Sequence, residues 1–362
     1  MHARAPVAGG RFPRYLKKGA VVSVLLLVLL LRSKVLRSKE AYGLETQKAF
    51  SHLFLSPGAI EDPQGKLGQR KLFHVPAKHL YLPAFFNLVD LEPSSLDHED
   101  DDINCTLTST TPKFHICVYP NEEDIYISAA LTSQGVWEPY ITRVLQLALT
   151  RFPEAVVIDV GANIGYYTLL TAAMGHQVVA VEPSQDNVRR LRRGAQLNGA
   201  IDKVYVLQNA LSRTHRNVSL VQNASNKGGI KVVEDRGRDH TVQTVVLDDL
   251  LHLIHTNTAI IKIDIEGYEC QGMAGSAKLL RSVYVPYILM EWQQMYKHRH
   301  VRSTACPTKI MQQMTDYLVR LGYHAHEVRT GMALNPYRST SAWQIGDVYW
   351  RHDQQPPLIP PL

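Results

Sequence analysis

The sequence is poor in cysteine and lacks the closely spaced cysteine pairs that typically hold zinc. Its 362 residues include only four cysteines, and none of them belongs to a C-x-x-C pair: Cys105, Cys117, Cys270 and Cys306. We therefore predict no zinc site. In an oxidising compartment Cys105 and Cys117 can form a disulfide, and the alternative is four free, buried thiols.

Acidic residues are absent from the first 39 positions, which contain nine lysines and arginines. The formal charge of the whole chain is +6, so the residues that follow carry about −3 together. The basic character therefore belongs to the N-terminus. It gives no support to a nucleic-acid-binding domain, and we predict no nucleic-acid partner.

The apolar run of this basic N-terminus, residues 19–31, is shorter than a typical membrane span. A helix of this length spans about 20 Å, whereas the hydrocarbon core of a bilayer is about 30 Å thick. Flanking lysines and arginines can extend the span by snorkelling, and no small-residue cleavage site follows the run. We expect an uncleaved signal anchor at residues 19–31; a cleaved signal peptide or an organelle-targeting segment is the alternative.

The central motif of the chain is Val156–Gly165, a β-branched strand that ends in one acid and two glycines. A buried strand that stops in such a turn and then opens a helix is typical of a nucleotide-binding turn. The glycine spacing differs from the G-x-G-x-x-G of dinucleotide folds, which excludes a dehydrogenase, and Asp159 would repel a pyrophosphate. The turn suits a cationic ligand without phosphate, such as S-adenosylmethionine.

Three further strands of this kind end in acidic residues. Val178–Val181 leads into Glu182, whose carboxylate can accept both ribose hydroxyls of a nucleoside. The alternative is an ordinary crossover with Glu182 on the surface. The other two strands begin at Ala259 and Tyr287, and the acids that end them lie at one sheet edge, where ligands bind.

For three further segments the sequence predicts only the local structure or the degree of exposure to solvent. Leu80–Leu91 is apolar enough to dock on the rest of the protein. Asn223–Gly229 is rich in glycine and asparagine, and we expect a mobile loop. The four arginines of the helix expected at Pro183–Asn198 are interpreted as a solvated face.

These motifs resemble the FkbM-type methyltransferases over about residues 135–350. The resemblance implies a class I S-adenosylmethionine-dependent fold: an α/β, Rossmann-like domain with a seven-stranded, mostly parallel sheet and helices on both faces. It also implies O-methylation of hydroxyls on natural products and sugars. The N-terminal anchor resembles that of animal methyltransferase-like members. The matching motifs, in the same order and spacing, are Ile158–Thr168, Glu182–Pro183, Asn209–Ser212, Leu247–Leu250 and Ile261–Glu269.

We expect the chain to consist of four parts, of which the first two, residues 1–112, gain nothing from the resemblance. Residues 1–40 form the basic N-terminus with the anchor, 41–112 a stem, 113–352 the methyltransferase domain and 353–362 a Pro-rich tail. Glycosylation sequons at Asn104, Asn217 and Asn223 favour a single-pass membrane protein with its catalytic domain in the lumen of the endoplasmic reticulum or Golgi.

The cofactor-binding residues are carried over from the family motifs. By resemblance, Glu182 holds the ribose, and Asn209 and Ala210 lie near the adenine. The residues expected at the methionine end are Asp159, Gly161, Asn163 and Gly165.

The catalytic residues are expected after the strand that begins at Ala259. Asp264 and Glu266 are the candidates for the general base, and Lys262 can pair with Asp264. The alternative for Glu266, and the role expected of Glu269, is to cap the next helix. Asp264 and Glu266 resemble half of a magnesium site, but no third ligand is evident, so we predict no metal.

Four more residues are expected near the substrate. Glu291 and Trp292 end a strand and can border the acceptor pocket. Trp137 and Glu138 can form a lid over the cofactor, with an ordinary helix start as the alternative.

We predict a membrane-anchored O-methyltransferase whose substrate is a glycan or a hydroxyl-bearing small molecule. One alternative keeps the fold and cofactor but faces the cytosol and methylates a protein or small molecule. Another is a non-catalytic, cofactor-binding scaffold. The residue pattern leaves the acceptor and the oligomeric state open.

Overall fold

The computed structural model describes residues 82–93, 102–223, 226–234, 241–301 and 303–360. The expected anchor at residues 19–31 and most of the expected stem lie outside these residues. Within the described ranges, no helix is both long enough and apolar enough to cross a membrane.

A seven-stranded sheet forms the centre of the molecule, and six of its strands run in the same direction. Strand β13 is antiparallel to both of its neighbours. The expected seven-stranded, mostly parallel sheet is therefore confirmed. In spatial order the strands are β12 (Tyr323–Glu327), β13 (Asp347–His352), β11 (Tyr287–Glu291), β10 (Ala259–Ile263), β3 (Val156–Val160), β4 (Val178–Val181) and β5 (Val204–Leu207).

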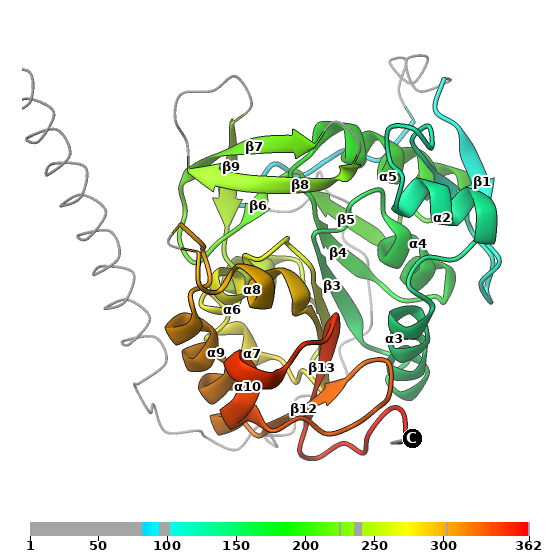
Figure 1. Ribbon diagram of the computed structural model, residues 1–362. Coiled ribbons are helices and arrows are strands. Elements are labelled where there is room, and N and C mark those ends of the chain that lie inside the picture. Colours follow the sequence, from blue (N-terminus) through cyan, green and yellow to red (C-terminus); the bar gives the residue numbers. More distant parts are fainter. Residues whose placement is uncertain (1–81, 94–101, 224–225, 235–240, 302, 361–362) are drawn as a thin grey trace, which may run out of the picture. The chain divides into compact units, whose positions relative to one another are not determined.

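Helices cover both faces of this sheet (Figure 1). On one face lie α3 (Pro139–Arg151), α4 (Tyr166–Ala173) and α5 (Gln185–Leu197). On the other lie α6 (Glu269–Met273), α7 (Leu279–Ser282) and α9 (Thr308–Arg320). The shorter elements are α2 (Ile127–Gln134), α8 (Gln293–His298), α10 (Ser339–Ala342) and the 3₁₀ helices η3 (Leu247–His252) and η4 (Pro336–Arg338).

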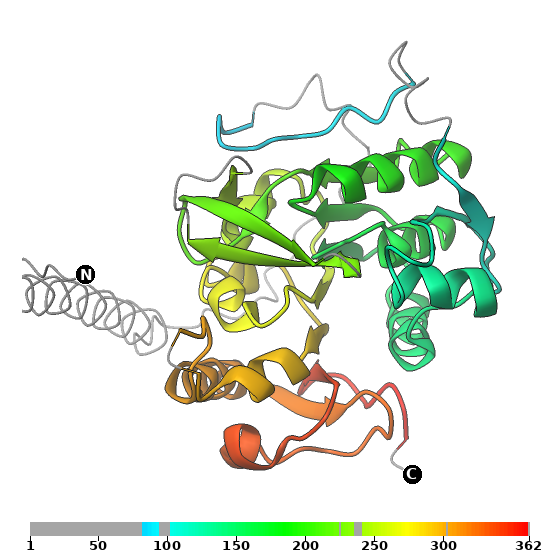
Figure 2. The ribbon, with the colours of Figure 1, turned by 45° about the horizontal axis from the view of Figure 1, so that its top comes forward.

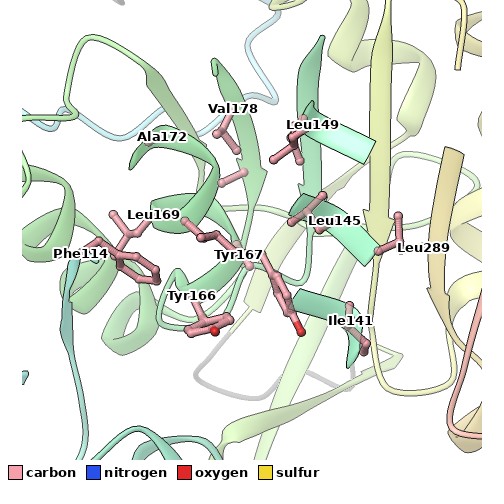
Figure 3. Close-up of a cluster of buried hydrophobic side chains, with 14 of the residues drawn as sticks. Phe114, Ile141, Leu145, Leu149, Tyr166, Tyr167, Leu169, Ala172, Val178 and Leu289 are labelled. Atoms are coloured by element: carbon pink, nitrogen blue, oxygen red, sulfur yellow. The ribbon is translucent and has the colours of Figure 1, made fainter. Parts of the chain in front are cut away.

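The core between the sheet and α3 follows from helix and strand periodicity. Ile141, Leu145 and Leu149 lie four residues apart, so they share one face of α3, and all three are buried. Figure 3 shows them near Tyr167 of α4 and Leu289 of β11. The central strands β3, β4 and β10 are rich in β-branched residues because helices bury them on both faces.

A second, four-stranded sheet contains β6 (Ala210–Leu211), β9 (Thr241–Val245), β7 (Asn217–Asn223) and β8 (Asn226–Glu234). Strands β7 and β8 form a long hairpin (Figure 2). Residues 226–229 belong to β8, so the expectation of a mobile loop over Asn223–Gly229 is wrong for this part. Glycine and asparagine weaken a strand locally, but pairing with β7 overrides that tendency.

Residues 82–93 dock along the edge strand β5. The amide of Val89 donates to the carbonyl of Val206 at 2.9 Å, and the amide of Gln208 donates to the carbonyl of Asn87 at 2.8 Å. Docking of this apolar segment was expected, and it covers an edge that would otherwise be open to pairing.

Two of the α5 arginines are only partly exposed, because each contacts a residue from a distant part of the chain. The Arg192 guanidinium donates to the carbonyl of Asp90 at 2.9 Å, and that of Arg190 lies 3.5 Å from the centre of the Tyr119 ring. Periodicity identified the face of the helix, but only the fold shows that residues from distant parts of the chain cover it.

Both pairs of cysteines form disulfides. Cys105 and Cys117 join β1 (Cys105–Leu107) to β2 (His115–Cys117). Cys270 and Cys306 join α6 to the segment that leads into α9. All four cysteines are paired, so the alternative of four free thiols is not what the structure adopts.

Candidate active site

A cavity of about 440 Å³ lies at the carboxyl ends of β3, β4, β10 and β11. This volume falls in the range of small-molecule sites, and the position agrees with the rule that ligands bind beyond the strand ends of such sheets. Six carboxylates and two lysines line the cavity: Glu138, Glu182, Asp264, Glu266, Glu291 and Asp347, with Lys262 and Lys297. The excess of carboxylates suits a cationic ligand.

The turn after β3 depends on left-handed backbone at Gly161, Asn163 and Gly165, with φ of 77°, 55° and 92°. A Cβ at Gly161 would lie 1.8 Å from the carbonyl oxygen of Asp264. A Cβ at Gly165 would lie 2.7 Å from the side chain of Leu191 on α5. Both glycines are thus required by the packing of the chain itself, whereas the expected reason was close approach of a ligand. Gly161 and Asn163 line the cavity, and Gly165 does not.

Asn163 is the one residue of this turn that adopts the left-handed conformation with a side chain. Asparagine is among the residues that tolerate this region best. Its side-chain oxygen accepts the amide of Ile164 at 2.7 Å, which stabilises the turn. Its own amide donates to the Glu182 carboxylate at 2.8 Å and so connects the two expected cofactor motifs.

Glu182 follows β4, lines the cavity and is buried. Besides the amide of Asn163, its carboxylate accepts the amide of Ser184 at 2.9 Å and the side-chain amide of Asn187 at 3.1 Å. Burial raises the pKa of Glu182 to about 7, although these hydrogen bonds oppose the shift. The three donors hold the carboxylate in place at the cavity, where it can accept ribose hydroxyls.

Asp159 is the last residue but one of β3; it is fully buried, and it is not among the residues that line the cavity. One carboxylate oxygen accepts the hydroxyl of Thr168 at 2.6 Å. The other, Oδ1, has no hydrogen-bond partner among the described residues. Burial raises the pKa of Asp159, and the nearby Lys262 opposes the shift. Because Asp159 does not line the cavity, its expected place at the methionine end of S-adenosylmethionine stays a prediction.

Asn209 and Ala210 both line the cavity. The side chain of Asn209 has a structural task, because it donates to the carbonyl of Phe85 at 3.0 Å and accepts the amide of Asn87 at 2.9 Å. It therefore holds the docked segment 82–93 against the domain. Its expected place near the adenine stays a prediction.

Lys262 is the buried cation of the site. Its ammonium lies 3.3 Å from the Asp264 carboxylate, as the sequence suggested. Burial alone would lower the pKa of Lys262, but Asp264, Asp159 and Glu138 together raise it. The lysine therefore stays charged and offsets part of the negative charge around it.

Glu138 lies at the start of α3 and at the cavity, and the lid expected of it stays a prediction. It directly precedes Pro139 at the start of α3, with φ of 41°, and it lines the cavity together with Trp137. Its carboxylate accepts the hydroxyl of Tyr167 at 2.8 Å. Burial, assisted by the nearby Asp264, raises the pKa of Glu138 to about 7.

The two candidate bases lie where the sequence suggested. Asp264 and Glu266 follow β10, and both line the cavity. Glu269 begins α6 but does not cap it: one of its oxygens accepts the amides of Ile265 at 2.9 Å and Gly267 at 3.3 Å, which fixes the turn before the helix.

Trp292 is the clearest departure from the expected substrate pocket. It is completely buried, its ring lies 4.8 Å from that of Trp343, and it does not line the cavity. Neighbouring residues at a strand end point to opposite sides. Glu291 therefore faces the cavity and Trp292 packs into the core, so the expectation was wrong for Trp292.

The sequence reasoning missed several cavity residues. Asp347 is the first residue of the antiparallel strand β13 and lies opposite Glu291. The amino-terminal end of β13 therefore lies beside the carboxyl end of β11. Only the antiparallel direction of β13 brings Asp347 to this edge, and the sequence analysis did not predict that direction. Other missed residues come from several elements, and nothing in their local sequence marks them. Among them are Tyr126 just before α2, Ile127 of α2, Ile230 and Val232 of β8, and Gln293, Gln294 and Lys297 of α8.

Two comparisons with sequences bear on these observations. The profile of the Methyltransferase FkbM domain matches residues 159–325. The hexuronic acid methyltransferase AglP of Haloferax volcanii is 28% identical over 165 residues, which cover 43% of this chain and 67% of that protein.

Solved structures show more distant similarity. An O-methyltransferase from Bacillus cereus in complex with SAH is 14% identical, covers 60% of this chain and 82% of its own, and has a TM-score of 0.35. A putative O-methyltransferase from Klebsiella pneumoniae is also 14% identical, covers 60% and 81%, and has a TM-score of 0.33. The fold assignment rests on the strand order above and not on these two structures.

The profile match spans β3 to β12, and therefore contains the turn after β3, Glu182 and the residues that follow β10. The chain is accordingly an S-adenosylmethionine-dependent methyltransferase, and its residues 159–325 form an FkbM-type methyltransferase domain.

Proposed function

We propose that this enzyme methylates a hydroxyl group of a glycan or a related small molecule, with a uronic acid as the first candidate acceptor. The observation that carries the proposal is the carboxylate-rich cavity, in which Glu138, Asp264 and Glu266 can accept hydrogen bonds from hydroxyls. The Haloferax relative, a hexuronic acid methyltransferase, supports the choice of sugar.

The chemistry required of the chain is limited. When bound, S-adenosylmethionine supplies an activated methyl group. The residues of the cavity must hold the acceptor oxygen in line, exclude water and take up the proton that the hydroxyl loses. Asp264 and Glu266 orient the acceptor. Glu138 takes the proton, because a base with a pKa of about 7 is well matched to neutral pH.

The test is methyl transfer from S-adenosylmethionine to a panel of uronic acid glycosides, neutral glycosides and simple alcohols, followed by product mass spectrometry. We expect Glu138→Gln to lower kcat by about a hundredfold or more, the usual contribution of a positioned acid or base. Asp264→Asn should also lower kcat, because it disturbs the orientation of the acceptor. Glu154→Gln is the matched control, because Glu154 is exposed and precedes β3 at the opposite end of the strand. Methylation of amines or thiols, with none at hydroxyls, would overturn the proposal.

We also propose that the enzyme is anchored by residues 19–31 with its catalytic domain in the secretory lumen. The two disulfides support this placement, because such bonds persist in oxidising compartments. Asn104 and Asn217 of the sequons are exposed, as glycosylation requires.

A glycosidase assay on the full chain expressed in animal cells tests this placement. We expect deglycosylation to lower the mass of the chain. This decrease should be smaller in the Asn104→Gln or Asn217→Gln variant. An unmodified chain whose catalytic domain is degraded by protease added outside intact microsomes would favour the cytosol-facing alternative.

A further inference from the structure

Three carboxylates from separate elements meet at one side of the cavity. Asp264 follows β10, Glu269 begins α6 and Glu291 ends β11. One carboxylate oxygen of each lies within 4.8 Å of the corresponding oxygens of the other two. The sequence supplied only Asp264 and Glu266 as possible ligands, and the fold supplies the others.

The side chain of Glu269 is the strongest sign that the cluster holds a ligand. Glu269 is completely buried, and the amides of Ile265 and Gly267 fix its first oxygen. Its second oxygen, Oε2, is also buried and has no hydrogen-bond partner among the described residues. Leaving a carboxylate oxygen without a partner in the interior is costly, so native structures rarely do so without a reason.

Glu291 repeats this pattern from the neighbouring strand. Its Oε2 is likewise buried without a hydrogen-bond partner in the described part of the chain. Lys262, the buried lysine of the site, is already paired with Asp264 and also offsets the charge of Asp159. Among the described residues, the ion pair of Lys262 is with Asp264, and no lysine or arginine forms an ion pair with Glu269 or Glu291.

We propose that Asp264, Glu269 and Glu291 bind one hard divalent cation, Mg²⁺, Mn²⁺ or Ca²⁺. The donor set contains only carboxylate oxygens, without histidine or cysteine, and these cations prefer such ligands. Three oxygens within 4.8 Å of one another can surround one cation if they draw together. The contraction needed is larger for Mg²⁺, whose oxygen ligands lie at about 2.0–2.1 Å, than for Ca²⁺, whose oxygen ligands lie at about 2.3–2.6 Å.

The cation site opens towards the cavity, because Asp264 and Glu291 both line it. Three protein oxygens leave at least three positions of a six- to eight-coordinate ion for other oxygen ligands. This part of the inference rests on the proposed function: neighbouring hydroxyls of the acceptor would occupy those positions. A divalent cation would also lower the pKa of a bound hydroxyl, which makes its proton easier to remove.

Cation binding can be measured without any methyl acceptor. Electron paramagnetic resonance of free Mn²⁺, titrated with the full chain, counts bound ions directly. We expect one bound Mn²⁺, displaced by excess Mg²⁺ or Ca²⁺. Glu269→Gln and Glu291→Gln each keep the shape of the side chain but remove its charge, and should weaken Mn²⁺ binding at least tenfold. Glu154→Gln should bind Mn²⁺ like the wild type.

Thermal melting shows whether each variant is folded. Mn²⁺ should raise the Tm of the wild type and of Glu154→Gln, because it binds only the folded state, and should leave the Tm of the two cluster variants nearly unchanged. Equal Mn²⁺ binding by the wild type and by a folded Glu269→Gln variant would overturn the site.

Methyl-transfer assays with and without EDTA test separately whether the bound cation takes part in acceptor binding. Mn²⁺ binding with methylation that falls on EDTA treatment supports both inferences. Binding without any hydroxyl methylation would leave the cation site standing and overturn the proposed function. Methylation of hydroxyls that EDTA does not change would overturn the role of the cation in catalysis.

Discussion

At the scale of single residues, backbone strain is concentrated around the cavity. Glu138, Asn163 and Glu266 are the residues other than glycine with positive φ in the described ranges, and all three line the cavity. Such conformations cost about 1–3 kcal/mol each and persist where the surrounding structure imposes them. At Glu138 and Asn163 the imposing contacts are the Tyr167 hydroxyl and the Glu182 carboxylate.

A comparison of two glycines separates backbone strain from steric conflict. Gly161 and Gly199 both have positive φ, but a Cβ at Gly199 would meet nothing within 4 Å. We expect Gly199→Ala to lower the free energy of unfolding by about 1–2 kcal/mol. Gly161→Ala should cost clearly more and abolish cofactor binding, because the new Cβ would collide with the Asp264 carbonyl. Denaturant unfolding and calorimetry measure both effects, and equal losses for the two variants would contradict this reading.

The raised pKa of Glu182 predicts pH-dependent cofactor binding. A protonated carboxyl is a poorer acceptor for ribose hydroxyls, so S-adenosylmethionine affinity should rise with pH and level off above the pKa of about 7. Well below that pH the affinity should fall by up to about tenfold per pH unit. Calorimetry at several pH values provides the measurement, with Glu182→Gln expected to bind weakly and without this dependence. The pKa of Asp159 is also raised, so Asp159→Asn serves as a second control that shows whether Asp159 contributes to the pH dependence.

The same shift affects stability in the opposite direction. The folded state retains the Glu182 proton to higher pH than the unfolded state, whose pKa is near 4.5. The stability contributed by this group is therefore greatest at low pH and is lost as the pH rises from about 4.5 to 7. A Glu182→Gln variant should lose this part of the pH dependence of the Tm.

At the scale of secondary-structure elements, the cavity depends on how α2 and the β7–β8 hairpin are held. Asp124 lies just before α2, and its carboxylate accepts the amide of Ser128 at 2.8 Å and the hydroxyl of Ser128 at 2.7 Å. The adjacent Glu123 binds Lys227 of β8 through an ion pair of 2.6 Å and a backbone hydrogen bond of 3.1 Å. One loop thus positions two elements that line the cavity.

Asp124 should therefore be important for both stability and binding. It is completely buried, and we expect Asp124→Ala to lower the free energy of unfolding by about 2 kcal/mol, as the loss of a strong helix cap does. The cofactor affinity should also fall, because Tyr126 and Ile127 of this segment line the cavity. Glu122→Ala is the control, since Glu122 is exposed and surface changes usually stay within about 0.5 kcal/mol. Equal unfolding curves for the two variants would disprove the capping role.

At the scale of the whole molecule, the disulfides join parts that are separated along the chain. Cys270–Cys306 closes a loop of 36 residues and attaches α6, which begins with Glu269, to the segment before α9. Cys105–Cys117 closes only 12 residues within a pair of short strands. Residues 82–93 add a further long-range contact along β5.

The longer disulfide loop should contribute more to stability. In the chain-entropy treatment, closing loops of these lengths stabilises the fold by about 4 kcal/mol for Cys270–Cys306 and about 3 kcal/mol for Cys105–Cys117. We expect Cys270→Ser/Cys306→Ser to have the lower Tm of the two double variants. Adding a reductant to the wild type should lower its Tm at least as far as either variant. A reductant-insensitive Tm would show that the disulfides do not contribute to stability.

Much of the fold and part of the site followed from local sequence. The β-branched runs at Val156, Val178 and Ala259 form strands because only a buried parallel sheet accommodates them, and the acids that follow lie at one edge because parallel strands end together. Glu182, Asp264 and Glu291 were recognisable for this reason. The FkbM motifs added the seven-stranded, mostly parallel sheet and the cofactor.

The tertiary structure decided what depends on contacts between distant segments. It brought Glu269 and Asp347 beside residues from other strands, turned Trp292 into the core, and placed β8 at a cavity where a mobile loop was expected. Periodicity and turn-forming residues reflect only the conformational preferences of short stretches of the chain. Which carboxylates share one small space is set by the packing of helices and strands, and no local pattern of residues contains that information.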